Sequence, residues 1–317
     1  MLSRVLVALV FVGLLLAAVV FAPSGGDSLW LRTLHNFAHV PIFGAITWAA
    51  LFALRSVPAL VSRPPVQQYA IAFAVAAFLG GATELAQVPS GRDASWMDLC
   101  NDLLGAATFL ALYAAFERGA GQRHAAARTI YFIGGALVLA YAASPHASAA
   151  IAYAHRANGF PAIADFTRGV GEEFISTRFT SIDVEPIPEP WASRSQRALR
   201  IDFYPGSWPG IEFTEPPPNW QGYRTLQVEV INPTSVELAF TIRIDDRQHN
   251  GREADRFVRA FEVAPATRAI FSIPLQDIES APRDRRFDLT QVRRIIMFRS
   301  KTSSAERMYL VGMRLKK

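Results

Sequence analysis

Residues 224–245 read RTLQVEVINPTSVELAFTIRID, and their apolar side chains alternate with polar ones. The alternating apolar positions are Leu226, Val228, Val230, Leu238, Phe240, Ile242 and Ile244. A period of two places such side chains on one face of an extended strand and the polar ones on the other. The stretch therefore predicts two half-buried β-strands.

Similar short segments surround this stretch. Candidate strands lie at 174–182, 198–204, 209–214, 256–263, 267–273, 292–299 and 307–315. Turn-forming clusters such as Pro205–Gly206 and Pro216–Asn219 separate them. Many short strands between polar turns, without a long amphipathic helix, predict an all-β sandwich of about 150 residues over 158–317.

The composition changes towards the N-terminus. The chain has 317 residues, of which 51% are hydrophobic and 19% are charged. Residues 1–150 contain 14 charged side chains (8 Arg and 6 acidic), whereas residues 151–317 contain 45. Five apolar stretches, at 5–22, 36–54, 69–88, 99–116 and 129–145, match the length of a membrane span. We therefore expect a multidomain membrane protein, with an α-helical transmembrane bundle of about five helices over 1–145, a linker at 146–157 and then the sandwich.

Arginines in the short loops predict the orientation of these spans. With the N-terminus in the cytoplasm, six loop arginines lie inside, whereas Arg32 and Arg92 lie outside. Five spans then place the protein in the inner membrane and the sandwich in the periplasm or outside the cell. Two alternatives stay open. Residues 5–22 could be a cleaved signal peptide, which Pro23 disfavours, and a chain with four spans would keep the sandwich in the cytosol.

Composition also argues against two kinds of site. The net charge of +5 could indicate nucleic-acid binding, but the basic residues are interspersed with acidic ones, as in Arg283–Asp284–Arg285–Arg286, and form no positive stripe. Cys100 is the only cysteine, so the chain can form neither an internal disulfide nor a cysteine metal site. We expect no nucleic-acid partner.

The few polar residues of the apolar half are spaced to share helix faces. They are His35, His39, Glu84, Gln87, Arg92, Ser95, Asp98, Asn101 and Asp102. His35 and His39 lie four residues apart, and Ser95 precedes Asp98 by three residues, as a helix N-cap does. The topology brings the outer ends of three helices to one membrane face, which predicts that these residues form one cluster there.

Two interpretations of this cluster stay open. Ionisable groups inside a membrane usually face a bundle interior or a water-filled cavity, which favours a polar site open to the outside. The alternative is a structural network, in which Glu84 pairs with Arg92 and His39 donates to a backbone carbonyl. Two histidines and two carboxylates can also bind a metal, but no metal-ligand signature accompanies them, so no metal is expected.

An ordered motif runs through the same residues. It consists of His39 with Phe43 four residues on, Glu84-x-x-Gln87, Gly91–Arg92, and Ser95-x-x-Asp98-x-x-Asn101-x-x-x-Gly105. Over residues 1–120 this set resembles the VanZ-like family of small membrane proteins. The resemblance implies a location in the bacterial cell envelope rather than a particular reaction. A fifth span goes beyond the four that are usual in that family.

Residues of the second half carry another resemblance. The matching segments are Ala164–Asp165–Phe166, Pro209–Gly210–Ile211, Asn219–Trp220–Gln221–Gly222–Tyr223 and the closing strand 308–315. They resemble the galactose-binding-like jelly roll, the fold of many carbohydrate-binding modules, which implies carbohydrate binding. The final strand of such modules often carries Asp-Asn, and this Asp often helps hold a structural calcium. Val311–Gly312 stands there in this chain, so the resemblance supports calcium only weakly, and no other cofactor is predicted.

Sugar recognition needs an aromatic face and hydrogen-bonding groups at fixed positions. The candidate aromatic platforms are Trp208, Trp220 and Tyr223. The candidate hydrogen-bonding groups are Asp245, Asp246, Arg247, Gln248, His249, Asn250 and Arg252. The alternatives are core packing for the tryptophans and a self-contained hydrogen-bonded loop for the polar run.

Three functions follow from these patterns. The leading one is a membrane-anchored envelope protein, with lipid around the bundle and a glycan or envelope polysaccharide on the sandwich. The second is an integral-membrane enzyme acting on a lipid-linked or envelope glycan, with Glu84 or Asp98 as acid or base. Neither a G-x-S-x-G motif nor a phosphate loop accompanies it. The third is an envelope assembly factor that binds a protein, which the sequence does not identify.

Overall fold

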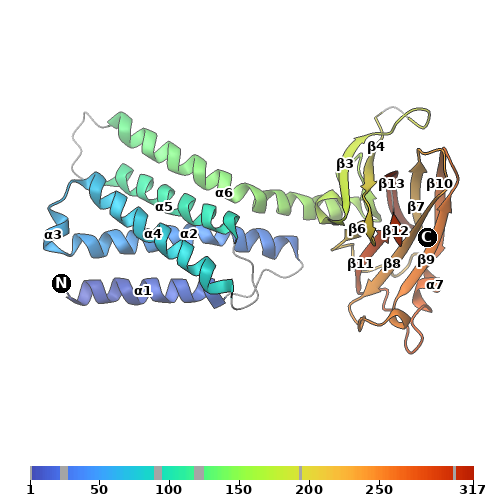
Figure 1. Ribbon diagram of the computed structural model, residues 1–317, viewed down its shortest axis with the longest axis horizontal. Helices are drawn as coiled ribbons and strands as arrows, with labels where there is room; N and C mark the ends of the chain where they lie inside the picture. Colours follow the sequence, from blue (N-terminus) through green and yellow to red (C-terminus); the bar gives the residue numbers. More distant parts are fainter. Residues whose placement is uncertain (1, 22–27, 89–94, 118–124, 193–194, 303–304) are drawn as a thin grey trace. The chain divides into compact units, whose positions relative to one another are not determined.

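The computed structural model describes residues 2–21, 28–88, 95–117, 125–192, 195–302 and 305–317. The chain divides into two compact units, Met1–Ala149 and Ala150–Lys317. The first unit is helical, and the second is built from antiparallel sheets (Figure 1). The division lies at the change in composition.

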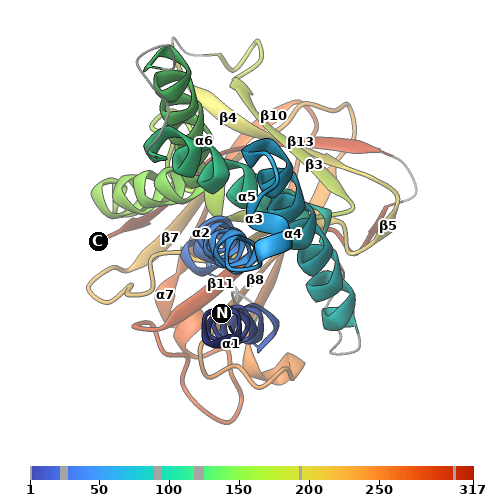
Figure 2. The ribbon, with the colours of Figure 1, turned by 90° about the vertical axis from the view of Figure 1, so that its left-hand side faces the viewer.

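The helical unit is a bundle in which α2 is central. Its helices are α1 (Leu2–Phe21), α2 (Leu29–Arg55), the short α3 (Pro58–Val61), α4 (Pro65–Gln87), α5 (Trp96–Phe116) and most of α6 (Ala125–Gly159). Helix α2 packs against α1, α4 and α5, and Figure 2 views α1 and α2 nearly end-on. Helix α6 lies along α5, where the Arg128 side chain donates to the Ala115 carbonyl. It reaches the start of α2, where the His146 and Trp30 rings lie 4.0 Å apart.

Five of the described α-helices, all except α3 and the short α7 (Leu275–Glu279) of the second unit, are long and apolar enough to cross a membrane. Each of the five apolar stretches seen in the sequence falls on one of them. The structure differs at 146–157, the expected linker, which is the C-terminal part of the 35-residue helix α6. Six alanines in this segment explain the difference, because alanine has the highest helix propensity.

The second unit consists of two large sheets. The first contains β1 (Ala162–Asp165), β3 (Thr180–Pro186), β4 (Arg197–Phe203), β7 (Thr225–Asn232), β10 (Thr267–Pro274) and β13 (Glu306–Lys316). The second contains β2 (Ile175–Arg178), β6 (Gly210–Phe213), β8 (Leu238–Asp246), β9 (Phe257–Val263) and β11 (Val292–Phe298). The strand orders are β10-β7-β13-β4-β3, with β1 beside β13, and β2-β6-β11-β8-β9. The two-residue strands β5 (Gly206–Ser207) and β12 (Lys301–Thr302) pair separately, and α7 covers Leu275–Glu279.

The strand pairing is nested. Strand β4 pairs with β13, β6 with β11, β7 with β10, and β8 with β9. The chain therefore forms a long hairpin that is wrapped into two sheets, which is the topology of a jelly roll. The inward side chains of both sheets form one core, including Leu199 and Val228 from the first sheet and Phe213, Phe240 and Ile295 from the second.

The predicted strands are confirmed with small shifts at their ends. The stretch quoted at the outset contains β7 and all but the last residue of β8, and its alternating apolar residues are all buried. The predicted strand 174–182 is in fact two strands, β2 and β3, which belong to different sheets. Strand β1 was not predicted, because Ala162–Asp165 is too short and too rich in alanine to show an alternating pattern.

Candidate functional sites

The polar residues of the helical unit converge at the common end of α2, α4 and α5. The His39 ring on α2 contacts the Asp102 carboxylate on α5, with 2.8 Å between Nδ1 and Oδ1, and both side chains are buried. Since a carboxylate only accepts, His39 Nδ1 carries the proton. The structural-network alternative had His39 donate to a backbone carbonyl, whereas in the structure Nδ1 donates to the Asp102 carboxylate.

Two glycines bring the helices together at this pair. A Cβ on Gly105 of α5 would lie 2.2 Å from the Val40 carbonyl oxygen of α2. A Cβ on Gly80 of α4 would lie 2.9 Å from Asp102 Oδ2. Without side chains at these positions, the three helices approach closely enough to enclose the carboxyl group of Asp102.

The remaining members surround the pair. Glu84 Oε2 on α4 accepts from the Ser95 backbone N–H at 2.6 Å, and Ser95 Oγ accepts from the Asp98 N–H at 3.1 Å. The second contact confirms the predicted N-cap. Asn101 donates to the Asn36 carbonyl at 3.2 Å. The structure thus brings together the candidate residues that it describes, with Gln87 buried near the end of α4. Arg92 lies outside the described residues.

A pocket of about 500 Å³ lies on the outer face of the five-stranded sheet. Strand register aligns one row across it: Ser176, Glu212, Ile296, Arg243 and Val258. A second row aligns Arg178, Gly210, Phe298 and Thr241. Trp208, Glu253 and Arg256 line the pocket from the loops or short turns beside the strands.

Aromatic side chains lie at one side of this sheet pocket. Trp208 is 52% exposed, and its ring meets that of Phe298 edge-to-face at 5.5 Å. A Cβ on Gly210 would lie 2.3 Å from the Met297 carbonyl oxygen. A side chain there would push the neighbouring strands apart below the two rings.

Arg243 is held firmly at the centre of the row. Asp245 accepts from Arg243 and also, at 2.6 Å, from Arg294. Burial raises the pKa of Asp245, but the hydrogen bonds from both arginines outweigh it and hold the pKa below its usual range. The His249 ring also contacts Arg243, with 3.2 Å between Nε2 and the guanidinium nitrogen. Arg243 is therefore presented to the sheet pocket in one orientation.

Several predicted glycan-binding residues lie elsewhere. Trp220 is fully buried in the core and donates its indole N–H to the Pro217 carbonyl, so it is not a platform. Its apolar indole completes the core where the chain turns before β7. Tyr223 packs against the same core, and its ring meets that of Phe160 edge-to-face. Of the three aromatic candidates, Trp208 alone lines the sheet pocket.

The predicted polar run is largely an internal network. Asp246 is fully buried and accepts two hydrogen bonds from Arg285 and one from the Asp288 N–H. Asp245 is likewise buried, so neither carboxylate is available to a ligand. His249 contacts the Asp255 carbonyl, whereas Arg247, Gln248, Asn250 and Arg252 are exposed without lining the pocket. The alternative of a self-contained loop fits these contacts.

The sequence interpretation missed most residues of the sheet pocket, including Arg178, Glu212, Thr241, Arg243 and Phe298. The sequence signal that could have identified them is the set of outward-facing residues that alternate with the buried ones along each strand. In 236–245 the residues between the buried ones include Thr241 and Arg243. Only the strand register, which sequence does not reveal, shows that they meet Glu212 and Phe298.

Comparison with known proteins identified no family. No protein family model matches the chain, and no curated protein matches it. The VanZ-like resemblance therefore stays a prediction.

Several solved structures are similar to part of the chain. An exo-β-agarase has a TM-score of 0.40 and 12% identity over 49% of this chain and 25% of its own. The family 11 carbohydrate-binding module from Clostridium thermocellum, solved with a mixed-linked tetrasaccharide, has a TM-score of 0.35 and 10% identity over 45% and 88% of the two chains. A CBM22-1 xylan-binding domain from Paenibacillus barcinonensis has a TM-score of 0.31 and 14% identity over 46% and 88%. This chain thus spans a quarter of the agarase, and similarities of this size assign it no ligand.

Proposed function

We propose that this protein is a membrane-anchored glycan-binding protein of the bacterial cell envelope. The observation that carries the proposal is the sheet pocket, which an exposed Trp208 lines together with Arg243, itself held by Asp245. Carbohydrates are bound by such a combination, because sugar rings present C–H faces to aromatic rings and hydroxyls to fixed donors and acceptors.

The pocket contains both hydrogen-bond donors and hydrogen-bond acceptors. Arg178, Arg243 and Arg256 supply donors, while Glu212 and Glu253 supply acceptors. A volume of about 500 Å³ lies within the range of small-molecule sites and suits a short run of sugar units. Several outward residues of neighbouring strands contribute, so the pocket runs across strands and can accommodate an extended chain.

The anchoring half of the proposal rests on the surface of the helical unit. Large apolar side chains point outward on its helices, such as Leu14, Phe78 and Leu137, and Phe78 is 75% exposed. A helix that is apolar all round is typical of a membrane span. With five spans and the N-terminus in the cytoplasm, the sandwich lies in the periplasm or outside the cell. Its glycan would then be an envelope polysaccharide.

Binding can be tested with the full chain in a detergent that has no sugar headgroup. We expect the protein to be retained on at least one immobilised envelope or plant polysaccharide, and the Trp208→Ala variant to lose retention without losing its fold. The matched control is Tyr204→Ala, an exposed ring in a separate cavity on the other sheet. Equal retention of wild type and Trp208→Ala would exclude the sheet pocket. Loss of retention in the Tyr204→Ala variant alone would indicate that the glycan binds at the other sheet.

A second function is favoured by the buried pair His39 and Asp102. A histidine oriented by a carboxylate can accept and return protons, so the helical unit could act on a lipid-linked glycan. His39→Gln and Asp102→Asn variants test the pair, and Glu84→Gln and Asp98→Asn test the predicted acid or base, in cells that depend on the protein. Full cellular activity in all four variants would exclude this function.

A further inference from the structure

His39 is positioned as a metal ligand would be. Its Nδ1–H donates to Asp102, so Nε2, on the other side of the ring, is the nitrogen that carries the lone pair. Metal-binding histidines almost always donate their second ring N–H to a carboxylate or carbonyl in this way, which fixes the tautomer and the ring orientation.

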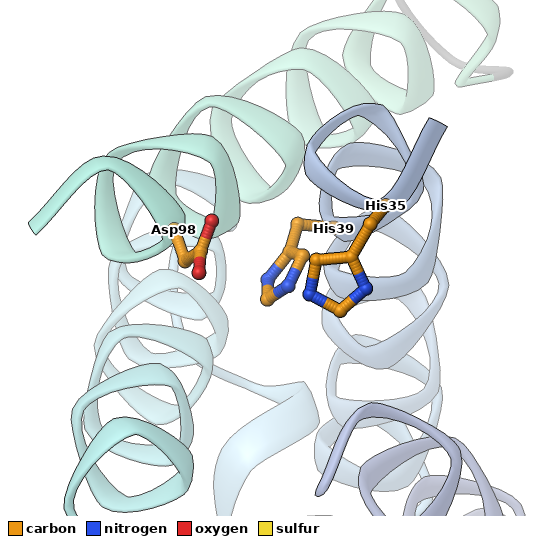
Figure 3. Close-up of side chains that lie close together, drawn as sticks. All are labelled: His35, His39 and Asp98. Atoms are coloured by element: carbon orange, nitrogen blue, oxygen red, sulfur yellow. The ribbon is translucent and has the colours of Figure 1, made fainter. Parts of the chain in front are cut away.

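Two further donor groups lie beside this ring. His35 precedes His39 by one turn of α2, and their rings meet edge-to-face at 5.3 Å. Asp98 precedes Asp102 by one turn of α5. Figure 3 shows the Asp98 carboxyl facing the His39 ring, with His35 on the same helix as His39. One ligand atom from each of His35, His39 and Asp98 lies within 4.8 Å of the other two.

These separations are close to those between the ligand atoms around a bound ion. Zinc lies about 2.0–2.2 Å from nitrogen and oxygen ligands, so tetrahedral ligand atoms stand ~3.4 Å apart. Rotamer adjustments of about 1 Å in His35 and Asp98, both of them only partly buried, would close the difference.

The charge around the three residues calls for a cation. Glu84 is 5% exposed and Asp102 is 1% exposed, and each has one buried oxygen without a hydrogen-bond partner among the described residues. Within the described ranges, no arginine or lysine pairs with Glu84, Asp98 or Asp102. Carboxylates inside an apolar bundle are costly without a positive partner, and a divalent ion would supply the charge that no arginine or lysine of the described residues supplies there.

We propose that His35, His39 and Asp98 bind a divalent transition-metal ion of the zinc class, and that Asp102 is the positioning residue that orients His39. Mixed imidazole and carboxylate ligands suit this class of ion. Three protein ligands leave the fourth position of a tetrahedral ion open to water or to an anionic group. The site joins α2 to α5 and is independent of glycan binding by the sandwich.

Metal binding by the full chain in detergent tests this proposal. The protein is stripped with a chelator and titrated with Co²⁺, whose visible absorption reports tetrahedral coordination, and then with Zn²⁺, with bound metal counted by mass spectrometry. We expect one ion per chain, displaced by Zn²⁺. His39→Asn and Asp98→Asn should abolish the tetrahedral spectrum, and Asp102→Asn should weaken Co²⁺ affinity about 10–100-fold.

His146→Asn is the matched control, because His146 lies at the same end of the bundle but contacts Trp30 and Thr33. It should bind Co²⁺ as wild type does. Asp98→Asn keeps the shape of the side chain, and its folding is checked by gel filtration. Should a histidine variant misfold, His35→Gln gives the same test at a less buried ligand. Absence of stoichiometric metal on folded wild type, or an unchanged spectrum in folded Asp98→Asn or His35→Gln, would overturn the proposal.

Discussion

The two units of this chain both bury carboxylates but compensate them differently. In the sandwich, Asp245 and Asp246 are fully buried, and arginines hold each of them through several hydrogen bonds. In the helical unit, Asp102 has a histidine and Glu84 a backbone N–H, and each keeps an oxygen without a partner among the described residues. The first arrangement is complete within the protein and stabilises it, whereas the second has room for a further ligand.

The largest effect should come from breaking the complete network. Arg285→Ala would leave Asp246 buried without the guanidinium that donates to both of its oxygens, and it would remove a donor to Asp255. We expect the free energy of unfolding of the sandwich to fall by about 3–5 kcal/mol. Urea unfolding of the full chain in detergent, followed by proteolysis of the sandwich, measures it. Arg247→Ala, an exposed neighbour, should change stability by less than about 0.5 kcal/mol. Similar losses in both variants would contradict the comparison.

Acid should weaken the same network. The hydrogen bond from Arg285 lowers the pKa of Asp255, and the pKa of Asp245 is lowered as described above. A group whose pKa is lower in the folded state adds stability that is complete above its unfolded pKa of about 3.9. That stability is lost as the pH falls through the folded pKa. We therefore expect the sandwich to lose stability steeply below about pH 4, and Asp245→Asn to make the loss shallower. An identical pH profile would show that Asp245 does not contribute.

A smaller effect is expected where the helices meet. Gly105→Ala places a Cβ 2.2 Å from the Val40 carbonyl oxygen and must push α5 away from α2. Overpacking of this kind costs about 1–3 kcal/mol, and it should also lower Co²⁺ affinity by separating the ligands. Thermal unfolding in detergent and the Co²⁺ titration measure the two effects. Gly134→Ala, which meets nothing within 4 Å, is the control and should be neutral or slightly stabilising.

The smallest effect concerns the start of α5. Ser95→Ala removes the N-cap hydroxyl of α5, which accepts from the Asp98 N–H, and should lower the free energy of unfolding by about 1 kcal/mol. Co²⁺ affinity should stay nearly unchanged, because Asp98 stays on its helix. Ser144→Ala, within α6, is the control for loss of a hydroxyl. A strong loss of Co²⁺ binding in Ser95→Ala would mean that the cap, rather than the helix, positions Asp98.

The sequence predicted the strands and the helix cap, because these features depend on the local spacing of residues. The alternation in 224–245 located β7 and β8, and the spacing of Ser95 and Asp98 located a cap. It did not predict partners that are far apart in the chain, because register and helix packing depend on the whole fold. His39 and Asp102 are 63 positions apart, and their contact depends on Gly105, which lets α2 and α5 approach. Trp220 was misassigned because a core tryptophan and an exposed one look alike in a turn-rich segment.

The position of β13 has a consequence for biosynthesis. This strand, the last of the sandwich, lies in the middle of its sheet, between β7 and β4. During translation, β4 and β7 must therefore wait for residues 306–316 before their shared neighbour exists. The helices of the bundle, the last of which ends at Gly159, are complete more than a hundred residues before Glu306. The bundle should thus form cotranslationally and the sandwich only after it, slowly, as the many distant strand pairings require. Until then, the open strands are the segment of the nascent chain most exposed to aggregation and to chaperones.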